Sequence, residues 1–313
     1  MPGKIDYSDF QSSVWEDVSP IALDDADKTA VYIHLSEAFQ EIMGYFRAIM
    51  AKEEKSERAL ALTRLVIDEN AANYTAWFYR RECLKALKSD LKAELDLISD
   101  IAIDSPKNYQ IWYHRRAIVD LMNDGSKELG FTAEILDDDS KNYHAWSHRQ
   151  WVLKRFDLWQ DELDYVDVLL NEDLRNNSAW NQRWYVIQNT KASADGNLPD
   201  NVIDKEILYA QSFIEKAPHN ESPYNYLVGL LRKRRFSDFP SIRSHAEVLR
   251  FKVLPNGSKP YVGCAPLLGL LVFIYEQEND TKELAISICE ELGEKHDKIR
   301  RKYWKYRIEK IHT

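Results

Sequence analysis

A tryptophan recurs through the first half of this sequence at a nearly constant spacing. The four residues are Trp77, Trp112, Trp146 and Trp180. Each is followed three residues later by arginine and seven residues later by an aliphatic residue. Self-similarity at a period of about 34 residues is the signature of stacked helical hairpins, in which each repeat buries its apolar face against its neighbours. The spacing therefore predicts an all-α fold, a solenoid of stacked antiparallel helical hairpins.

An asparagine precedes each of these tryptophans by four residues, and it marks where the second helix of each hairpin should begin. The four residues are Asn73, Asn108, Asn142 and Asn176. An asparagine side chain at this position can accept a hydrogen bond from a free amide of the first helical turn. In a fifth unit Tyr224 replaces the tryptophan, again four residues after an asparagine, Asn220.

The sequence before and after these repeats extends the array less regularly. Residues 35–51 carry apolar side chains at helical spacing and predict the first clear helix. The repeat register loosens from Phe236, residues 263–277 predict a strongly apolar helix, and residues 281–293 and 297–312 predict a last hairpin. The pattern indicates about seven hairpins. We expect an acidic arm over residues 1–30, with Phe10 and Trp15 packed on the body or on a partner, and one helical-repeat domain over residues 31–313.

Composition excludes several classes of protein. The net charge of −9 gives no strong attraction to nucleic acid or to an anionic membrane. No run of about 18 apolar residues predicts a membrane span, and the first residues contain no apolar signal segment. The three cysteines, Cys83, Cys264 and Cys289, are far apart and form no C-x-x-C pair. This usage suits a reducing compartment, so we expect a cytoplasmic protein whose cysteines are core thiols.

The arginine that follows each tryptophan is expected to be half-buried and to need an anionic partner. An acidic residue lies eight positions before every tryptophan, at the turn between the two helices of the hairpin. We predict that the arginines pair with these acids. The four acids are Glu69, Asp104, Asp138 and Glu172.

Motifs of independent catalysis are absent from the sequence. His144 and His148 have the i, i+4 spacing of a zinc pair, but no catalytic glutamate follows His144 and no third ligand is suggested. No glycine-rich phosphate loop and no G-x-S-x-G motif occurs. We therefore expect no metal site on this chain alone. The starts of the second helices, which carry Asn, Tyr, Lys and His, are suited to anions because helix N-termini are electropositive.

The repeated motif resembles that of a known family. Asn-Tyr-x-x-Trp-x-x-Arg-Arg, together with 106–110 (Pro-Lys-Asn-Tyr-Gln) and 141–146 (Lys-Asn-Tyr-His-Ala-Trp), is similar to the alpha subunits of protein prenyltransferases. Within that family, the motifs resemble the subunit common to the farnesyl and type I geranylgeranyl enzymes. The resemblance covers nearly the whole chain from about Trp15. It implies a crescent-shaped, right-handed superhelix wrapped around a catalytic beta subunit, with which this chain would form an obligate heterodimer.

The resemblance also implies an activity. Enzymes of this family transfer a farnesyl or geranylgeranyl group from its diphosphate to the cysteine of a C-terminal CaaX motif. It implies zinc in the holoenzyme, carried by the beta subunit, and allows magnesium as a further ion. This chain would bind neither by itself. The choice of isoprenoid would lie in the beta subunit.

Six residues of this sequence match functional positions of the family. Lys107 matches the lysine that reaches the prenyl diphosphate, and it is our candidate catalytic residue. Tyr109 matches a tyrosine beside the isoprenoid and the peptide, and Gln110 a glutamine that binds the C-terminal carboxylate of the peptide. The three matching neighbours on the next repeat, which line the same seam, are Asn142, Tyr143 and His144.

Two other interpretations remain open from the sequence. The chain could be the alpha subunit of the Rab-type geranylgeranyltransferase, although the motifs at 107–110 and 141–144 favour the CaaX enzymes. It could instead be a non-enzymatic helical-repeat scaffold that binds peptides. Copurification with a zinc-bearing beta chain distinguishes the enzyme subunit from the scaffold.

Overall fold

The computed structural model describes residues 13–22, 35–232 and 234–312, and every regular element in these residues is helical. The chain divides into two compact units, Met1–Asp157 and Leu158–Thr313. This confirms the predicted all-α class. The single repeat domain and its boundaries stay a prediction, as does most of the N-terminal arm, because Phe10 and the other residues of 1–12 and 23–30 lie outside the described residues.

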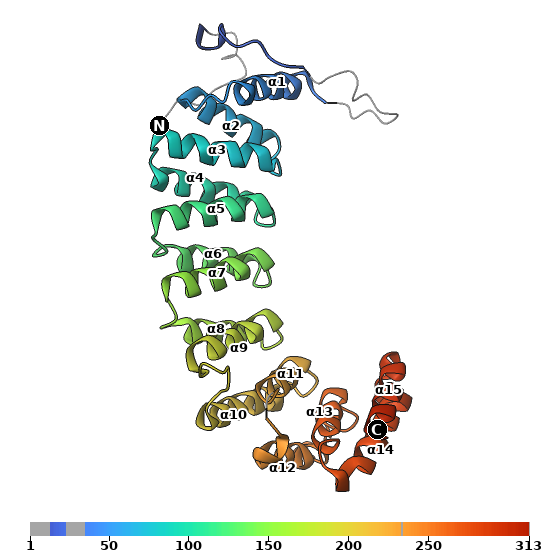
Figure 1. Cartoon of the computed structure of the whole chain (residues 1–313). Helices are drawn as coiled ribbons and strands as arrows, with labels where there is room; N and C mark the ends of the chain where they lie inside the picture. The colour runs from blue at the N-terminus through green and yellow to red at the C-terminus, as the bar shows by residue number, and fades with distance from the viewer. Residues whose placement is uncertain (1–12, 23–34, 233, 313) are drawn as a thin grey trace. The chain divides into compact units, whose positions relative to one another are not determined.

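The first unit contains three successive hairpins, preceded by one helix that packs on the first of them (Figure 1). The hairpins are α2–α3, α4–α5 and α6–α7. In the part of the unit that is described, its α-helices are α1 (Glu37–Ala51), α2 (Glu57–Glu69), α3 (Tyr74–Leu87), α4 (Leu91–Asp104), α5 (Tyr109–Met122), α6 (Glu128–Asp138) and α7 (Tyr143–Phe156).

The second unit continues the same pairing with less regular connections. Its described α-helices are α8 (Glu162–Glu172), α9 (Asn177–Lys191), α10 (Asp200–Lys216), α11 (Glu221–Leu230), α12 (Pro240–Arg250), α13 (Ala265–Tyr275), α14 (Lys282–Glu291) and α15 (Arg301–His312). A π-helical turn (Leu292–His296) and a 3-10 turn (Lys298–Arg300) join the last two. The sequence analysis did not predict α12, although Ile242, Ala246 and Leu249 are buried at helical spacing.

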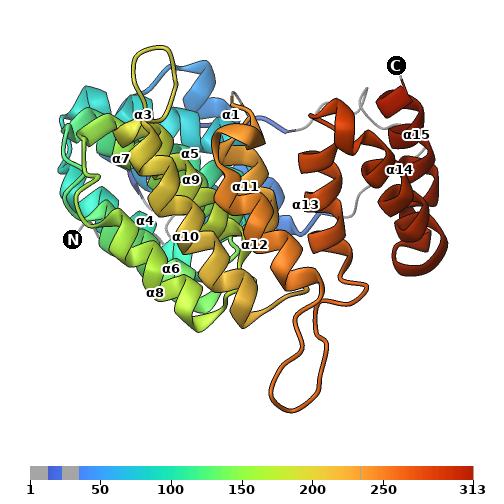
Figure 2. The ribbon, with the colours of Figure 1, turned by 90° about the horizontal axis from the view of Figure 1, so that it is seen from below.

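In the first unit the hairpins form two layers. Figure 2 shows α4 and α6 on one side and α5 and α7 on the other. Contacts between successive repeats join the second helices, α3 with α5 and α5 with α7. The starts of these second helices therefore lie next to one another along one edge of the stack, where the sequence placed the candidate site.

The asparagine caps and the tryptophans form the same local structure in each repeat. Asn142 Oδ1 accepts hydrogen bonds from the backbone amides of His144 and Ala145, at 2.9 and 3.0 Å. The indole Nε1 of Trp112 donates to the Pro106 carbonyl six residues earlier, at 2.8 Å. The same carbonyl also accepts a bond from Asn142 Nδ2, at 3.2 Å. The cap residue of one repeat is thus bonded to the turn of the repeat before it.

The fifth unit keeps this arrangement with a different side chain. The hydroxyl of Tyr224 donates to the Pro218 carbonyl, six residues earlier, at 2.9 Å. Its ring is buried, as the tryptophans are. The substitution of tyrosine for tryptophan therefore preserves both the packing and the hydrogen bond.

For three of the four repeated arginines the predicted partners were wrong. The acids at the turns are exposed, and these arginines bind instead a glutamate in the first helix of the following hairpin. Arg115 Nη2 and Nε lie 2.7 Å from the two carboxylate oxygens of Glu128, and Arg80 forms the same fork with Glu94. In the second unit Arg183 pairs in this way with Glu206. Planar guanidinium groups favour such two-point contacts with carboxylates.

Each of these buried glutamates accepts a hydrogen bond from a second side chain. It comes from the residue two positions after the repeated tryptophan. His114 Nε2 lies 2.8 Å from Glu94 Oε1, and His148 Nε2 lies 2.6 Å from Glu128 Oε2. Burial acts to raise the pKa of Glu94, but hydrogen bonds from His114 and Arg80 outweigh it and lower this pKa to about 2. Burial also lowers the pKa of both histidines, which therefore donate as neutral imidazoles.

Residues 13–22 pack on the first unit. Trp15 is buried and lies edge-to-face against Tyr45, with ring centroids 5.3 Å apart. Arg58 binds the Val14 carbonyl and the Asp17 carboxylate. Of the two alternatives for Trp15, packing on the body is therefore confirmed.

Candidate functional site

The six residues that the resemblance singled out all belong to the first unit and lie on two adjacent repeats. Lys107 precedes the cap of α5, and Tyr109 and Gln110 open that helix. Asn142 is the cap of α7, and Tyr143 and His144 open it. Because α5 and α7 are neighbours, the structure brings the two groups together at the same edge of the stack.

Lys107 provides an exposed cation at this edge. Its side chain is 74% exposed, and its Nζ lies 3.1 Å from Oδ2 of Asp139 in the turn before α7. The hydrogen bond from Lys107, and next the backbone amide of Lys141, hold the pKa of Asp139 below its ordinary value. The sequence analysis assigned Asp138 of this turn to a repeated arginine and gave no role to Asp139, so it missed this contact.

The turn before α7 and the start of that helix hold the backbone around Lys107 as well as its side chain. Asn142 donates to the Pro106 carbonyl, and the ring of His144 forms a hydrogen bond with the Lys107 backbone. Burial lowers the pKa of His144, and this hydrogen bond opposes the effect. Asn142 is itself buried, with its carbonyl oxygen used by the helix cap. Asn142 therefore lies beneath the exposed residues of the site and supports them.

The two tyrosines of the site are exposed and flank His144. The ring of Tyr109 lies edge-on to the imidazole with centroids 4.3 Å apart, and Tyr143 lies at 5.5 Å. Gln110 is half-buried beside them. His144 thus lies between two rings that come from different repeats.

These tyrosines belong to a longer row of exposed aromatic side chains. The row, here called the aromatic ridge, consists of residues that lie three before or one after the repeated tryptophan and that are each more than half exposed. Its members are Tyr74, Phe78, Tyr109, Tyr113 and Tyr143. An exposed apolar surface of this kind marks a site that another molecule covers.

The chemical capacity of this edge is to bind, rather than to react alone. It offers a cation beside helix N-termini, which suits an anion, and rings that suit an apolar chain or a partner. Within the described residues, no group of three or more His, Cys, Asp or Glu side chains could hold a metal ion. His148, the second member of the possible zinc pair, is buried and bonded to Glu128, away from the exposed edge.

The cysteines are also unsuited to nucleophilic chemistry. All three are buried and free. Burial raises the pKa of Cys83 to about 11 and that of Cys289 to about 11, and it raises the pKa of Cys264. Because the thiolate is the reactive form, these thiols are inert near neutral pH.

No described helix has the length and apolar character that crossing a membrane requires.

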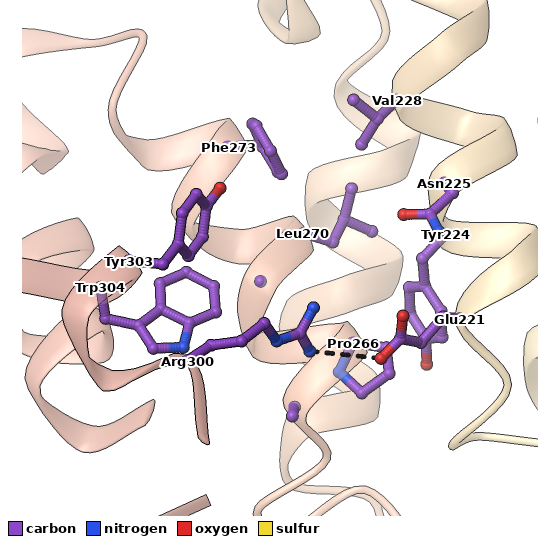
Figure 3. A pocket seen from close by; sticks show the side chains of 12 residues that line it. Glu221, Tyr224, Asn225, Val228, Pro266, Leu270, Phe273, Arg300, Tyr303 and Trp304 are labelled. Carbon is purple, nitrogen blue, oxygen red and sulfur yellow. Dashed lines mark hydrogen bonds and ion pairs between the residues drawn. The ribbon is translucent and has the colours of Figure 1, made fainter. Parts of the chain in front are cut away.

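The second unit contains a hollow that the sequence did not predict. Its volume is about 280 Å³, and it lies among α11, α13 and the start of α15. Figure 3 shows the rings of Tyr303 and Trp304 on one side of Leu270 and Tyr224 on the other. Arg300 and Glu221 form an ion pair at 3.2 Å across one end. None of the six candidate residues lines it.

The repeats of this chain are similar to those of a known protein family. Four segments of the chain, 56–87, 91–122, 126–156 and 159–190, match the family described as protein prenyltransferase alpha subunit repeat. They correspond to the hairpins α2–α3, α4–α5, α6–α7 and α8–α9.

Two curated relatives match over almost the full chain. The protein farnesyltransferase/geranylgeranyltransferase type-1 subunit alpha of Dictyostelium discoideum is 41% identical over 305 residues, covering 95% of this chain and 92% of that protein. The subunit of the same name from Candida albicans is 36% identical over 319 residues, covering 98% of each. A solved structure, Candida albicans protein geranylgeranyltransferase-I complexed with GGPP, matches with a TM-score of 0.80 and 35% identity over 99% of both chains.

Proposed function

Since this chain belongs to the protein prenyltransferase alpha subunit family, we propose that it is the alpha subunit shared by a protein farnesyltransferase and a type I geranylgeranyltransferase. The heterodimer transfers an isoprenoid from its diphosphate to the cysteine of a C-terminal CaaX motif. The observation that carries this proposal is the exposed Lys107 beside the starts of α5 and α7, in a chain whose relatives bear this name over nearly their full length. The names of those relatives favour this function over the Rab-type enzyme.

Lys107 binds the diphosphate in this proposal. Negative charge grows on the diphosphate as the carbon–oxygen bond breaks, and a fixed ammonium stabilises that charge more in the transition state than in the ground state. The hydrogen bonds from Asn142 and His144 to the segment around Lys107 support the role, because they fix the backbone that carries the ammonium.

The other exposed residues bind the apolar and peptide parts of the substrates. Tyr109 and Tyr143 line the isoprenoid and the peptide, together with the ring of His144 between them. Gln110 donates a hydrogen bond from its amide to the C-terminal carboxylate of the peptide. The rest of the aromatic ridge packs against the beta subunit, which would bury side chains that are exposed in this chain.

The metal belongs to the beta subunit. In this proposal zinc is carried by the beta subunit and any magnesium is an ion of the holoenzyme, as the resemblance implies. When bound there, zinc would lower the pKa of the substrate cysteine and so favour its thiolate form. The chain works in the cytoplasm, on soluble diphosphate and CaaX-protein substrates.

The first experiment is copurification of the tagged chain from its own cells, with the partner identified by mass spectrometry. The expected result is a stoichiometric heterodimer whose second subunit contains zinc. A stable monomer that carries no zinc-bearing partner would contradict the proposal and favour a peptide-binding scaffold.

The second experiment separates the roles of two residues in the heterodimer. Lys107→Ala is expected to lower the single-turnover rate by ~10²-fold, the scale of losing one fixed electrostatic donor, with less effect on peptide affinity. Gln110→Ala is expected to weaken peptide binding and leave the chemical rate nearly unchanged. Lys127→Ala is a matched control, because this lysine is also exposed and paired with an aspartate, at 3.7 Å. A wild-type rate for Lys107→Ala in an intact heterodimer would remove Lys107 from the reaction.

A further inference from the structure

Asp139 holds the Lys107 ammonium from the next repeat, and its own position is fixed. Its Oδ1 accepts a hydrogen bond from the backbone amide of Lys141 at 3.1 Å, which leaves Oδ2 to face Lys107. Its carbonyl accepts the amide of Asn142 at 2.9 Å. The carboxylate is therefore part of a formed turn, and it approaches Lys107 without depending on a flexible loop.

The pairing of Lys107 with Asp139 joins two successive repeats. The position seven residues before the tryptophan is Ser105 in the preceding repeat, which carries no charge, and Asp173 in the following one, where the same turn recurs with the Arg175 amide bound to Oδ1 at 2.9 Å. The two acids before Asp139 in the same turn, Asp137 and Asp138, are exposed and have no ion pair with Lys107. All three aspartates carry a charge, and what distinguishes Asp139 is that its carboxylate faces Lys107.

A carboxylate and a diphosphate cannot both bind Lys107 without cost. Each needs the same ammonium, and two anions at hydrogen-bonding distance of one cation repel each other. The Lys107–Asp139 pair is largely exposed, so it is weak enough to be exchanged. The pair would therefore open when a diphosphate arrives and form again when the phosphate group departs.

We infer that Asp139 is a positioning residue that competes with phosphate groups for Lys107 and so assists release of the inorganic pyrophosphate product. This inference rests on the proposed binding of diphosphate by Lys107. Between turnovers Asp139 keeps the ammonium at the site. After transfer of the isoprenoid, it replaces pyrophosphate as the partner of Lys107. The residue acts through Lys107 and takes no part in bond breaking.

The test is the affinity of the heterodimer for inorganic pyrophosphate, measured at low ionic strength by competition with the prenyl diphosphate. Asp139→Asn keeps an oxygen for the Lys141 amide but removes the charge that faces Lys107. It should tighten pyrophosphate binding about two- to fivefold, the range expected for a partly exposed ion pair. Asp139→Ser, which copies Ser105 of the preceding repeat, should act in the same direction and serves if the first variant folds poorly.

Two controls make the effect specific. Asp138→Asn removes the same charge from the same turn and should change the affinity much less. In a Lys107→Ala background, Asp139→Asn should have no further effect, because the competition needs the ammonium. A purely structural role of Asp139 predicts the opposite sign, since a disturbed site would bind pyrophosphate more weakly.

The outcomes separate this inference from the proposed function. If Lys107→Ala weakens pyrophosphate binding while both Asp139 variants match Asp138→Asn, or bind more weakly, the competition is refuted and diphosphate binding by Lys107 stands. If Lys107→Ala leaves pyrophosphate affinity unchanged, the role of Lys107 fails and the inference fails with it. Tighter binding in both Asp139 variants, abolished without Lys107, supports the inference.

Discussion

Replacing Arg115 by methionine removes one charge from a network that has no access to water. The Arg115 side chain is 2% exposed, and that of its partner Glu128 is 1% exposed. A third bond joins Arg115 Nη1 to Ser99 Oγ at 2.9 Å. Methionine keeps most of the packing against the Phe131 ring, over which the guanidinium lies at 3.4 Å. The variant therefore isolates the loss of the charge.

The expected cost follows from what remains around Glu128. Breaking a buried ion pair by removing one partner destabilises a protein by about 3–5 kcal/mol, because the other charge stays buried. Here His148 still donates to the carboxylate at 2.6 Å and can take up a proton to balance it. This places the cost near the lower value, about 3 kcal/mol. It should be smaller at pH 5.5 than at pH 8, because protonation of His148 is easier at the lower pH.

Amide hydrogen exchange of the heterodimer measures this locally. A loss of about 3 kcal/mol corresponds to a ~10²-fold loss of protection. The loss should be concentrated in α5 and α6, which Arg115 and Glu128 join. The matched control is Arg116→Met, since Arg116 is exposed and lies over the Trp151 ring at 4.7 Å. Its expected cost is at most about 1 kcal/mol.

A specific result would refute the reasoning. If Arg115→Met and Arg116→Met changed protection in α5 and α6 by the same small factor, the buried pair would contribute no more than a surface contact. A cost that did not depend on pH would show that His148 does not compensate for the lost charge of Arg115.

Two further predictions concern the stability of the repeats. His148→Gln should flatten the fall in unfolding free energy below about pH 6.5. The buried histidine has a lowered pKa, so the unfolded chain takes up a proton that the folded chain does not, and each such proton is worth about 1.4 kcal/mol per pH unit. Glutamine suits the position, because the equivalent Gln182 donates to its glutamate at 2.8 Å. Denaturant unfolding between pH 5 and 8 measures this slope, and an unchanged slope would contradict it. Gly125→Ala should destabilise by about 1–3 kcal/mol, because the new Cβ would clash with the Phe156 ring. Gly130→Ala, which meets no atom within 4 Å, should instead be neutral or stabilising in thermal unfolding, and equal effects of the two would argue against the clash.

Much of the fold was predictable because its determinants are local and repeated. The asparagine caps mark the starts of α3, α5, α7 and α9, and the tryptophan register held through the fifth unit despite Tyr224. The candidate site could be placed on adjacent helices from the repeat period alone. The roles of its residues came from the resemblance to the family, and they remain predictions that the geometry does not test.

The partners of the arginines could not be predicted from charge spacing alone. One set of acids lies at the turns, eight residues before each tryptophan. A second set lies 16 or 17 residues after the first three tryptophans, in the following first helices. Glu94 shares a helix face with the buried Ile98 and Ala102, whereas Asp104 is exposed. The sequence feature that identifies the partner of the arginine is therefore an acid that lies within the apolar stripe of its helix. The pairing of Lys107 with Asp139 depends on how two turns approach in space, which no period in the sequence records.

The pairing of Arg80 and Arg115 with a glutamate of the next hairpin has a consequence for how such chains change length. Glu128 occupies the position in its repeat that Glu94 occupies in the repeat before, and His148 corresponds in the same way to His114. Excising 91–124, which is one whole repeat, would put Glu128 opposite Arg80 and restore a complete buried network. A shorter excision within this stretch would leave an unmatched ion in the interior. Gene duplication or loss is thus tolerated in steps of a whole repeat, while insertions and deletions of a few residues are confined to loops outside this register.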